Sequence, residues 1–149
     1  MVFAIPVQSL RPSAPDAVTL TKPVTPAEGS SWVVSTTKAF ELAWTVPASP
    51  GPDQRILFGM LVFPTETPGS KWSTLHCSFP ISAGSATIPP EIFADMKRRA
   101  GATTTADMLM WFFAGGQKEF TGGGASYVIE AVRVDSVSPA RPGEFGQLE

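Results

Sequence analysis

The sequence predicts a mainly β domain: a single antiparallel β-sandwich of about seven strands with one short helix near residues 90–100. Two observations lead to this prediction. Short segments of alternating apolar and polar residues recur at spacings of about 8 to 15 residues, which is typical of antiparallel sheets. One segment, from Pro89 to Gly101, instead has the apolar spacing and the end residues of a helix.

The clearest strands are predicted from alternation, because successive side chains of a strand point to opposite faces. In segment 40–46 every second residue is apolar, and Pro47 ends the run. In segment 74–79 the same alternation turns Cys77 toward the core and His76 toward solvent. The residues expected to point inward are Phe40, Leu42, Trp44, Val46, Leu75, Cys77 and Phe79.

Other segments are predicted from composition and from their turns. Val18 and Leu20 open a first short strand, and Trp32 to Val34 are expected to pair locally. Segments 55–63 and 105–114 are apolar on both faces, as expected for strands that are covered on both sides. For segment 55–63 an interface strand is an equal alternative.

The end of the chain is expected to form a hairpin. Gly115 to Gly124 are predicted to be its glycine-rich loop, followed by a last strand from about residue 125 to residue 137. The apolar residues of this strand change phase between Ile129 and Val132, and a β-bulge would explain that slip.

The helix is predicted between the prolines and Gly101. Proline is tolerated in the first turn, acidic residues come early, basic residues come late, and glycine can adopt the left-handed conformation after the last turn. Ile92, Phe93, Met96 and Ala100 are expected to share the buried face. A sandwich domain is therefore expected over residues 17–138, between a flexible arm at 1–16 and a flexible tail at 139–149.

Composition argues against several function classes. A net charge of -2 gives no general attraction to nucleic acid. The single cysteine excludes an intramolecular disulfide and a cysteine-based metal site, and the single histidine sits next to it but on the opposite face of a strand. No apolar run is long enough for a helix to span a membrane. We therefore expect no catalytic residues, no metal and no cofactor.

Three motifs resemble a known type of module. These are Phe-x-Leu-x-Trp at 40–44, Leu-x-Cys-x-Phe at 75–79, and Gly-x-x-Thr-Ile-Pro at 84–89 before the short helix. In this order they resemble the immunoglobulin-like β-sandwich modules of bacterial secreted proteins and envelope lipoproteins. The resemblance implies a secreted or cell-envelope location, with an export signal that is not present in this chain, and it implies no enzymatic activity.

Binding is therefore the predicted function: a non-catalytic envelope or secreted module that binds or scaffolds another macromolecule, either a protein or a glycan. Trp72 is the predicted partner-binding residue, because a turn at Pro68-Gly69 places it near a strand edge and an exposed tryptophan often anchors a partner. One alternative is a small glycan hydrolase with paired carboxylates. Its candidate acids are Glu66, Asp107, Glu119 and Glu130. Another alternative is a self-assembling surface or appendage subunit, and the sequence leaves the oligomeric state open.

Overall fold

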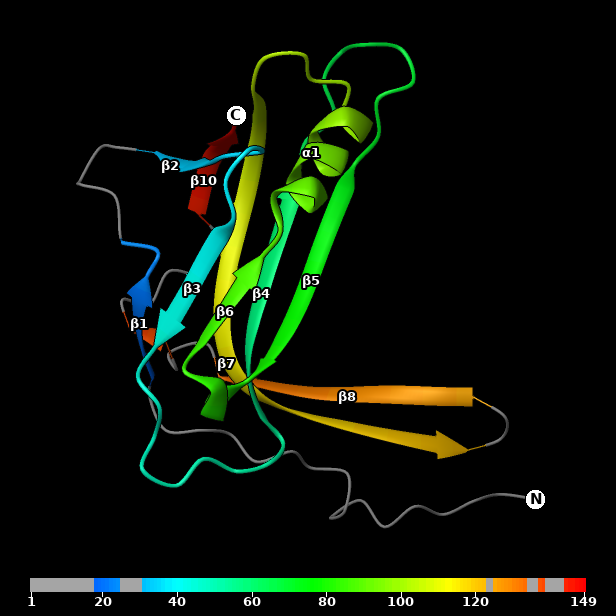
Figure 1. The fold of residues 1–149 in the computed structure, drawn as a ribbon. Helices are drawn as coiled ribbons and strands as arrows, with labels where there is room; N and C mark the ends of the chain where they lie inside the picture. The colour runs from blue at the N-terminus through cyan, green and yellow to red at the C-terminus, as the bar shows by residue number, and fades with distance from the viewer. Residues whose placement is uncertain (1–17, 25–30, 123–124, 134–136, 139–143) are drawn as a thin grey trace.

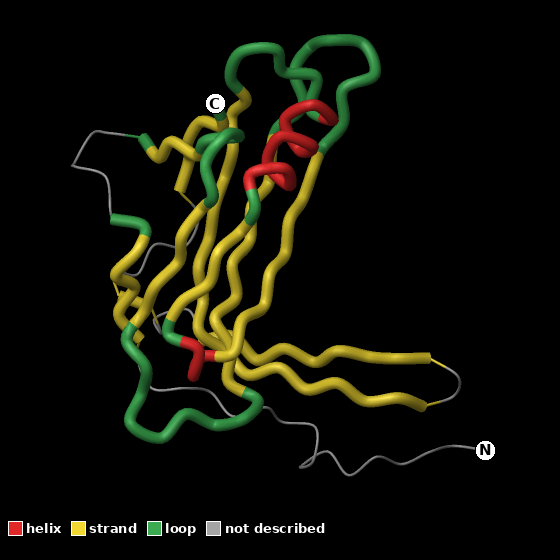
Figure 2. The backbone as a smooth tube through the Cα atoms, in the orientation of Figure 1, coloured by secondary structure: helices red, strands yellow, loops and turns green. Residues whose placement is uncertain are grey.

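The computed structural model describes residues 18–24, 31–122, 125–133, 137–138 and 144–149. Within these ranges the chain forms two β-sheets, one α-helix and one short 3-10 turn (Figures 1 and 2). The strands are β1 (Val18–Lys22), β2 (Trp32–Val34), β3 (Phe40–Trp44), β4 (Gln54–Val62), β5 (Ser73–Pro80), β6 (Ser85–Ile88), β7 (Ala106–Gly122), β8 (Ala125–Arg133), β9 (Val137–Ser138) and β10 (Glu144–Leu148). The α-helix is α1 (Pro90–Arg99), and the turn is η2 (Ile81–Ala83).

The larger sheet has six strands and is built around β4 and β7. Its order is β2-β10-β7-β4-β5, and β8 joins it by pairing with β7. β4 pairs in antiparallel fashion with β7 along its whole length, and with β5 from Arg55 opposite Pro80 to Val62 opposite Ser73. Among the described residues β5 is therefore one edge of this sheet.

The smaller sheet has four strands in the order β6-β3-β1-β9. β3 pairs in antiparallel fashion with β6 and β1, and β1 pairs in parallel fashion with β9. In Figure 1, β3, β6 and α1 lie in front of β4 and β7. The smaller sheet and the helix thus cover one face of the larger sheet.

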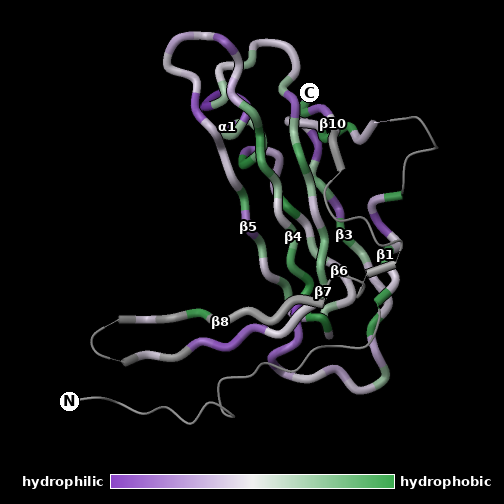
Figure 3. The backbone as a smooth tube through the Cα atoms, turned by 180° about the vertical axis from the view of Figure 1, so that it is seen from behind, coloured by the Kyte–Doolittle hydropathy of each residue, from purple (hydrophilic) through white to green (hydrophobic). Residues whose placement is uncertain are grey.

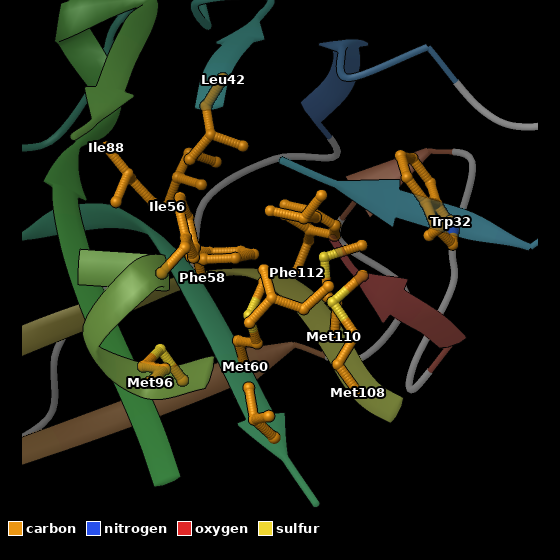
Figure 4. Packing of buried hydrophobic residues seen from close by; sticks show 14 of the residues in the cluster. Trp32, Leu42, Ile56, Phe58, Met60, Ile88, Met96, Met108, Met110 and Phe112 are labelled. Atoms are coloured by element: carbon orange, nitrogen blue, oxygen red, sulfur yellow. The ribbon is translucent and has the colours of Figure 1, made fainter. Parts of the chain in front are cut away.

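The core lies between these two layers (Figure 4). β4 contributes the row Ile56, Phe58, Met60 and Val62, and β7 contributes Met108, Met110, Phe112 and Ala114 on the same face. Trp44 from the smaller sheet is also buried, and its Nε1 donates a 2.7 Å hydrogen bond to the carbonyl oxygen of Ile81. The indole therefore enters the core without leaving its polar nitrogen unsatisfied.

Most of the inward-facing predictions are confirmed. Leu42 and Trp44 are buried, and Phe40, Leu75, Cys77 and Phe79 pack against the core while remaining partly exposed. The prediction is wrong for Val46, which is 45% exposed, because β3 ends at Trp44 and the alternation no longer fixes its direction.

The predicted helix is confirmed as α1, and Gly101 follows it with a left-handed φ of 75°. Phe93, Met96 and Ala100 are buried. Ile92 was expected on the same face, but it is 37% exposed, because it lies at the margin of the helix stripe that faces the sheets.

The hairpin differs from the prediction. β7 runs without interruption to Gly122, so Gly115–Gly122 belong to a strand rather than to a loop. Figure 1 shows the second part of β7 and β8 leaving the sandwich together as an arm. The predicted β-bulge is absent from Ala125–Arg133, whose pairing with β7 is continuous. The pairing of β7 with β4 ends at Gly116, so beyond that residue β8 is the only described strand that pairs with β7.

The two predicted flexible ends have different outcomes. Residues 1–16 and 139–143 lie outside the described residues. Glu144–Leu148, however, form β10, which pairs with β7 on one side and with β2 on the other. The prediction that Trp32 to Val34 pair locally is therefore wrong, because their partner is Gly146–Leu148. Patterns within short segments could not predict this contact, because the two strands are far apart in the sequence.

A pair of substitutions in β10 tests whether this segment is structural. Leu148 is fully buried, whereas its neighbour Gln147 is exposed on the opposite face. We expect Leu148→Ala to lower the free energy of unfolding by about 2–5 kcal/mol in urea titrations, because it leaves a cavity. Gln147→Ala should change it by less than about 0.5 kcal/mol. Equal, negligible effects would mean that the segment is not part of the fold.

Candidate functional site

One face of the larger sheet is apolar but is not covered by any described element. Figure 3 shows the molecule from this side, with hydrophobic residues along β4. Leu57 on this face is buried. The other large apolar side chains on it are only half-buried: Leu61, Phe63, Leu109, Trp111 and Phe113. We refer to this surface, together with Trp72 and His76, as the open face.

The open face explains why segments 55–63 and 105–114 are apolar on both faces. One apolar row of each strand forms the core, and the other row forms the open face. For 55–63 the described residues do not provide cover on both sides, so the interface strand stays a prediction. The expectation that 105–114 are covered on both sides is not met by them, because the smaller sheet and α1 lie on one side only.

At the centre of the open face the indole of Trp111 lies over Gly59. The two residues are register partners, and a Cβ added to Gly59 would stand 2.0–2.3 Å from three atoms of the indole ring. His76, on β5, is the register partner of Gly59 on its other side, and its ring centroid is 5.7 Å from that of Trp111. The glycine thus makes room for an aromatic ring that bridges three strands.

A shallow hollow of about 300 Å³ adjoins this ring. Its described lining combines aromatic and aliphatic side chains with uncharged polar ones: Leu57, Phe58, His76, Cys77, Ser78, Trp111, Phe113 and Gln117. The hydroxyl of Ser78 donates a 2.7 Å hydrogen bond to Oε1 of Gln117. Two polar side chains that are hydrogen-bonded to each other, Ser78 and Gln117, therefore lie beside the indole on the same side of the sheet.

Trp72, the residue predicted from the sequence, lies at one end of the open face. It is 60% exposed, and no other described tryptophan or phenylalanine side chain is exposed. Its ring packs edge-on against Phe63 with the centroids 5.1 Å apart. This contact holds the indole at the surface without covering it, so the exposure that the prediction required is present.

His76 and Cys77 are separated as predicted from the strand period. His76 is exposed on the open face, whereas Cys77 packs against the core. Burial raises the pKa of the Cys77 thiol. Deprotonation is therefore disfavoured, and the residue behaves as a small apolar side chain.

The acids considered for glycan hydrolysis are not brought together as a pair in any hollow described here. Glu66 and Glu119 are exposed, and Asp107 is also exposed beside a hollow of about 370 Å³ whose described lining holds no second carboxylate. Glu130 lies on β8, and its side chain is outside the described part of the structure. In the described ranges no three histidine, cysteine or acidic side chains form a group that could hold a metal ion.

Two further observations concern membranes and relatives. No helix in the described ranges has the length and apolarity needed to cross a membrane. A comparison with known proteins found no matching family model, no similar curated protein and no similar solved structure. The function is therefore inferred from the geometry of this chain.

Sequence reasoning missed the relation between Trp111, Gly59 and His76. The single glycine within the apolar segment 55–63 was a usable signal, because a glycine inside a strand often marks a close approach by another group. The identity of that group required the register, which places residues 59, 76 and 111 in one row across three strands.

The Trp111–Gly59 contact can be tested by a double-mutant cycle. We expect Gly59→Ala to destabilise the protein by about 1–3 kcal/mol and to change the near-ultraviolet circular dichroism, because the new methyl group displaces the indole. In a Trp111→Ala background the same change should cost clearly less. Equal costs in both backgrounds would show that the indole does not occupy this position.

The environment of Cys77 predicts slow thiol chemistry. At pH 8 we expect the folded protein to react with a disulfide reagent at least about tenfold more slowly than the urea-unfolded chain, because burial limits both access and ionisation. The absorbance of the released thiolate gives both rates. Rapid reaction of the folded protein would contradict the inward placement of this side chain.

Proposed function

We propose that this chain is a non-catalytic cell-envelope or secreted module that binds another macromolecule through its open face. The observation that carries the proposal is the row of Trp111, Gly59 and His76, with Trp72 at the end of the same face. Large exposed apolar patches on folded domains usually mark an interaction site, and aromatic anchors dominate binding energies.

A neutral polysaccharide is the partner whose chemistry fits this surface best. The described lining of the hollow at Trp111 contains an indole, an imidazole, a hydroxyl and an amide, and it contains no Asp, Glu, Lys or Arg. A pyranose ring has an apolar C–H face that can pack on an indole and a rim of hydroxyl groups that can bond to Ser78 and Gln117. An anionic or cationic ligand would find no opposite charge in this lining.

The non-catalytic part of the proposal rests on the same surroundings. A nucleophile needs a base within hydrogen-bond reach, and Cys77 and His76 project from opposite faces of β5. The Ser78 hydroxyl instead donates a hydrogen bond to Oε1 of Gln117, and an amide oxygen is not a base that could activate it.

The proposed location and relationship come from the motifs. The resemblance of segments 40–44, 75–79 and 84–89 to immunoglobulin-like envelope modules supports a secreted or envelope protein. Two packed sheets with a tryptophan of the Phe-x-Leu-x-Trp motif in their core are consistent with that relationship.

Binding to neutral oligosaccharides tests the proposed function. Hexamers of β-1,4-linked glucose, β-1,4-linked N-acetylglucosamine and α-1,4-linked glucose are titrated into the full chain while tryptophan fluorescence is recorded. We expect at least one hexamer to bind, and Trp111→Ala to weaken its binding about tenfold or more. Trp72→Ala should weaken binding of the same hexamer, because both rings lie on one face.

Thr87→Ala serves as the control variant, because Thr87 is exposed on the smaller sheet. It should bind with unchanged affinity. Failure of all three hexamers to bind would contradict the proposed partner chemistry, and a protein captured in a Trp111-dependent way would then be the partner instead. Release of shorter sugars on long incubation would contradict the non-catalytic assignment.

A further inference from the structure

A second candidate surface lies at the edge of the larger sheet, away from the open face. β5 pairs only with β4 among the described strands, so its other edge presents backbone N–H and C=O groups that no described strand pairs with. Such an edge is a template for another strand, and proteins usually protect it by shortness, charge, proline or a bulge.

The edges of this molecule differ in that protection. In the smaller sheet β6 has 4 residues and β9 has 2, and β2 at the other end of the larger sheet has 3. β8, which pairs only with β7 among the described strands, has 9 residues, but its sequence includes the charged residues Glu130 and Arg133. β5 has 8 residues, its register with β4 is continuous, and it contains no Asp, Glu, Lys or Arg. A proline occurs only at its last position, Pro80. β5 is therefore a long edge that lacks the usual devices against pairing.

A groove runs beside this edge. A hollow of about 390 Å³ is lined by Ser73, Thr74 and Leu75 of β5 and by Glu91, Ile92, Asp95, Met96 and Arg99 of α1. Two hydrogen bonds hold the end of the helix against the segment before β5: the N–H of Thr65 donates to Ala100, at 2.9 Å, and that of Lys71 donates to Arg99, at 2.9 Å. The two walls of the groove are thus tied together.

The spacing of the walls suits an extended chain. In an added strand every second side chain faces α1, at intervals of about 6.5 Å. Glu91 and Asp95 are one turn apart on the helix, about 6 Å along its axis. Successive inward side chains of the added strand can therefore meet successive turns of α1.

The charged residues of the groove determine which kind of peptide is complementary to it. Asp95 forms ion pairs with Arg98 and Arg99. Glu91 is exposed, and no ion pair to it occurs among the described residues. Leu75, Ile92 and Met96 also line the groove and form its apolar floor. An added strand with a basic side chain near Glu91 and an apolar side chain over the floor would complement both the carboxylate and the apolar surface.

From these observations we propose that β5 and α1 form a binding site for an extended peptide of a partner protein. The peptide adds to the larger sheet as a strand alongside β5, with a basic side chain near Glu91 and an apolar side chain in the groove. A second copy of β5 fits less well, because residues 73–80 contain no lysine or arginine, and the residues two positions from their one histidine, Thr74 and Ser78, are polar. This site is separate from the open face and does not depend on its function.

The test uses the full chain and a positional-scanning library of acetylated, amidated hexapeptides, with binding measured by fluorescence polarisation. We expect peptides that combine a lysine or arginine with an apolar residue two positions away to bind best. The best binder is then made in two further forms, with N-methyl groups on either its odd or its even residues. One form should lose binding and the other should keep it, because only one edge of an added strand pairs with β5.

Glu91→Gln should weaken the best binder about two- to fivefold, and less so in high salt. Glu119→Gln makes the same change at an exposed site on the arm and should have no effect. The proposal is overturned if no library member binds, or if both N-methylated forms bind equally. Concentration-dependent association of the protein that the best binder abolishes would also overturn it, because the edge would then belong to a second copy.

Discussion

The continuous antiparallel pairing of β4 with β7 is the constraint on which the rest of the structure depends. It places Phe58 opposite Phe112 and Met60 opposite Met110, and these rows form the floor of the core. The same register places Gly59 opposite Trp111 on the other face. A slip by one residue would exchange the two faces and expose the core row. The core and the open face are thus two consequences of one pairing.

The two proposed sites meet at β5, the edge partner of β4. Its outward residue His76 belongs to the open face, whereas its unpaired edge and Leu75 border the groove of α1. The chemistry of the two sites differs. The open face offers an aromatic ring with uncharged hydrogen-bonding groups, and the edge offers backbone groups with one exposed carboxylate. One strand can therefore serve two partners of different kinds without a shared contact.

Local sequence patterns predicted those helices and strands that are determined by residues close together in the sequence. Proline, charge order and glycine predict α1, and alternation predicts β3 and β5. What escaped prediction depends on distant partners. The pairing of Trp32 to Val34 with β10 joins segments 114 residues apart in the sequence, and Gly115–Gly122 become a strand because β8 pairs with them. The exposure of Trp72 could be predicted because its place near a turn is a local property, whereas the arrangement around Trp111 requires a register across three strands.

The four tryptophans provide the most direct test of the open face. Trp32 and Trp44 are buried, whereas Trp72 and Trp111 lie on the open face. The indole N–H signals of the ¹⁵N-labelled protein can be followed during titration with the oligosaccharide hexamers. Shifts of the Trp111 and Trp72 signals, with those of Trp32 and Trp44 unchanged, are the predicted result. Shifts confined to Trp32 or Trp44, or saturable binding that moves none of the four, would contradict the assignment of the open face as the binding surface.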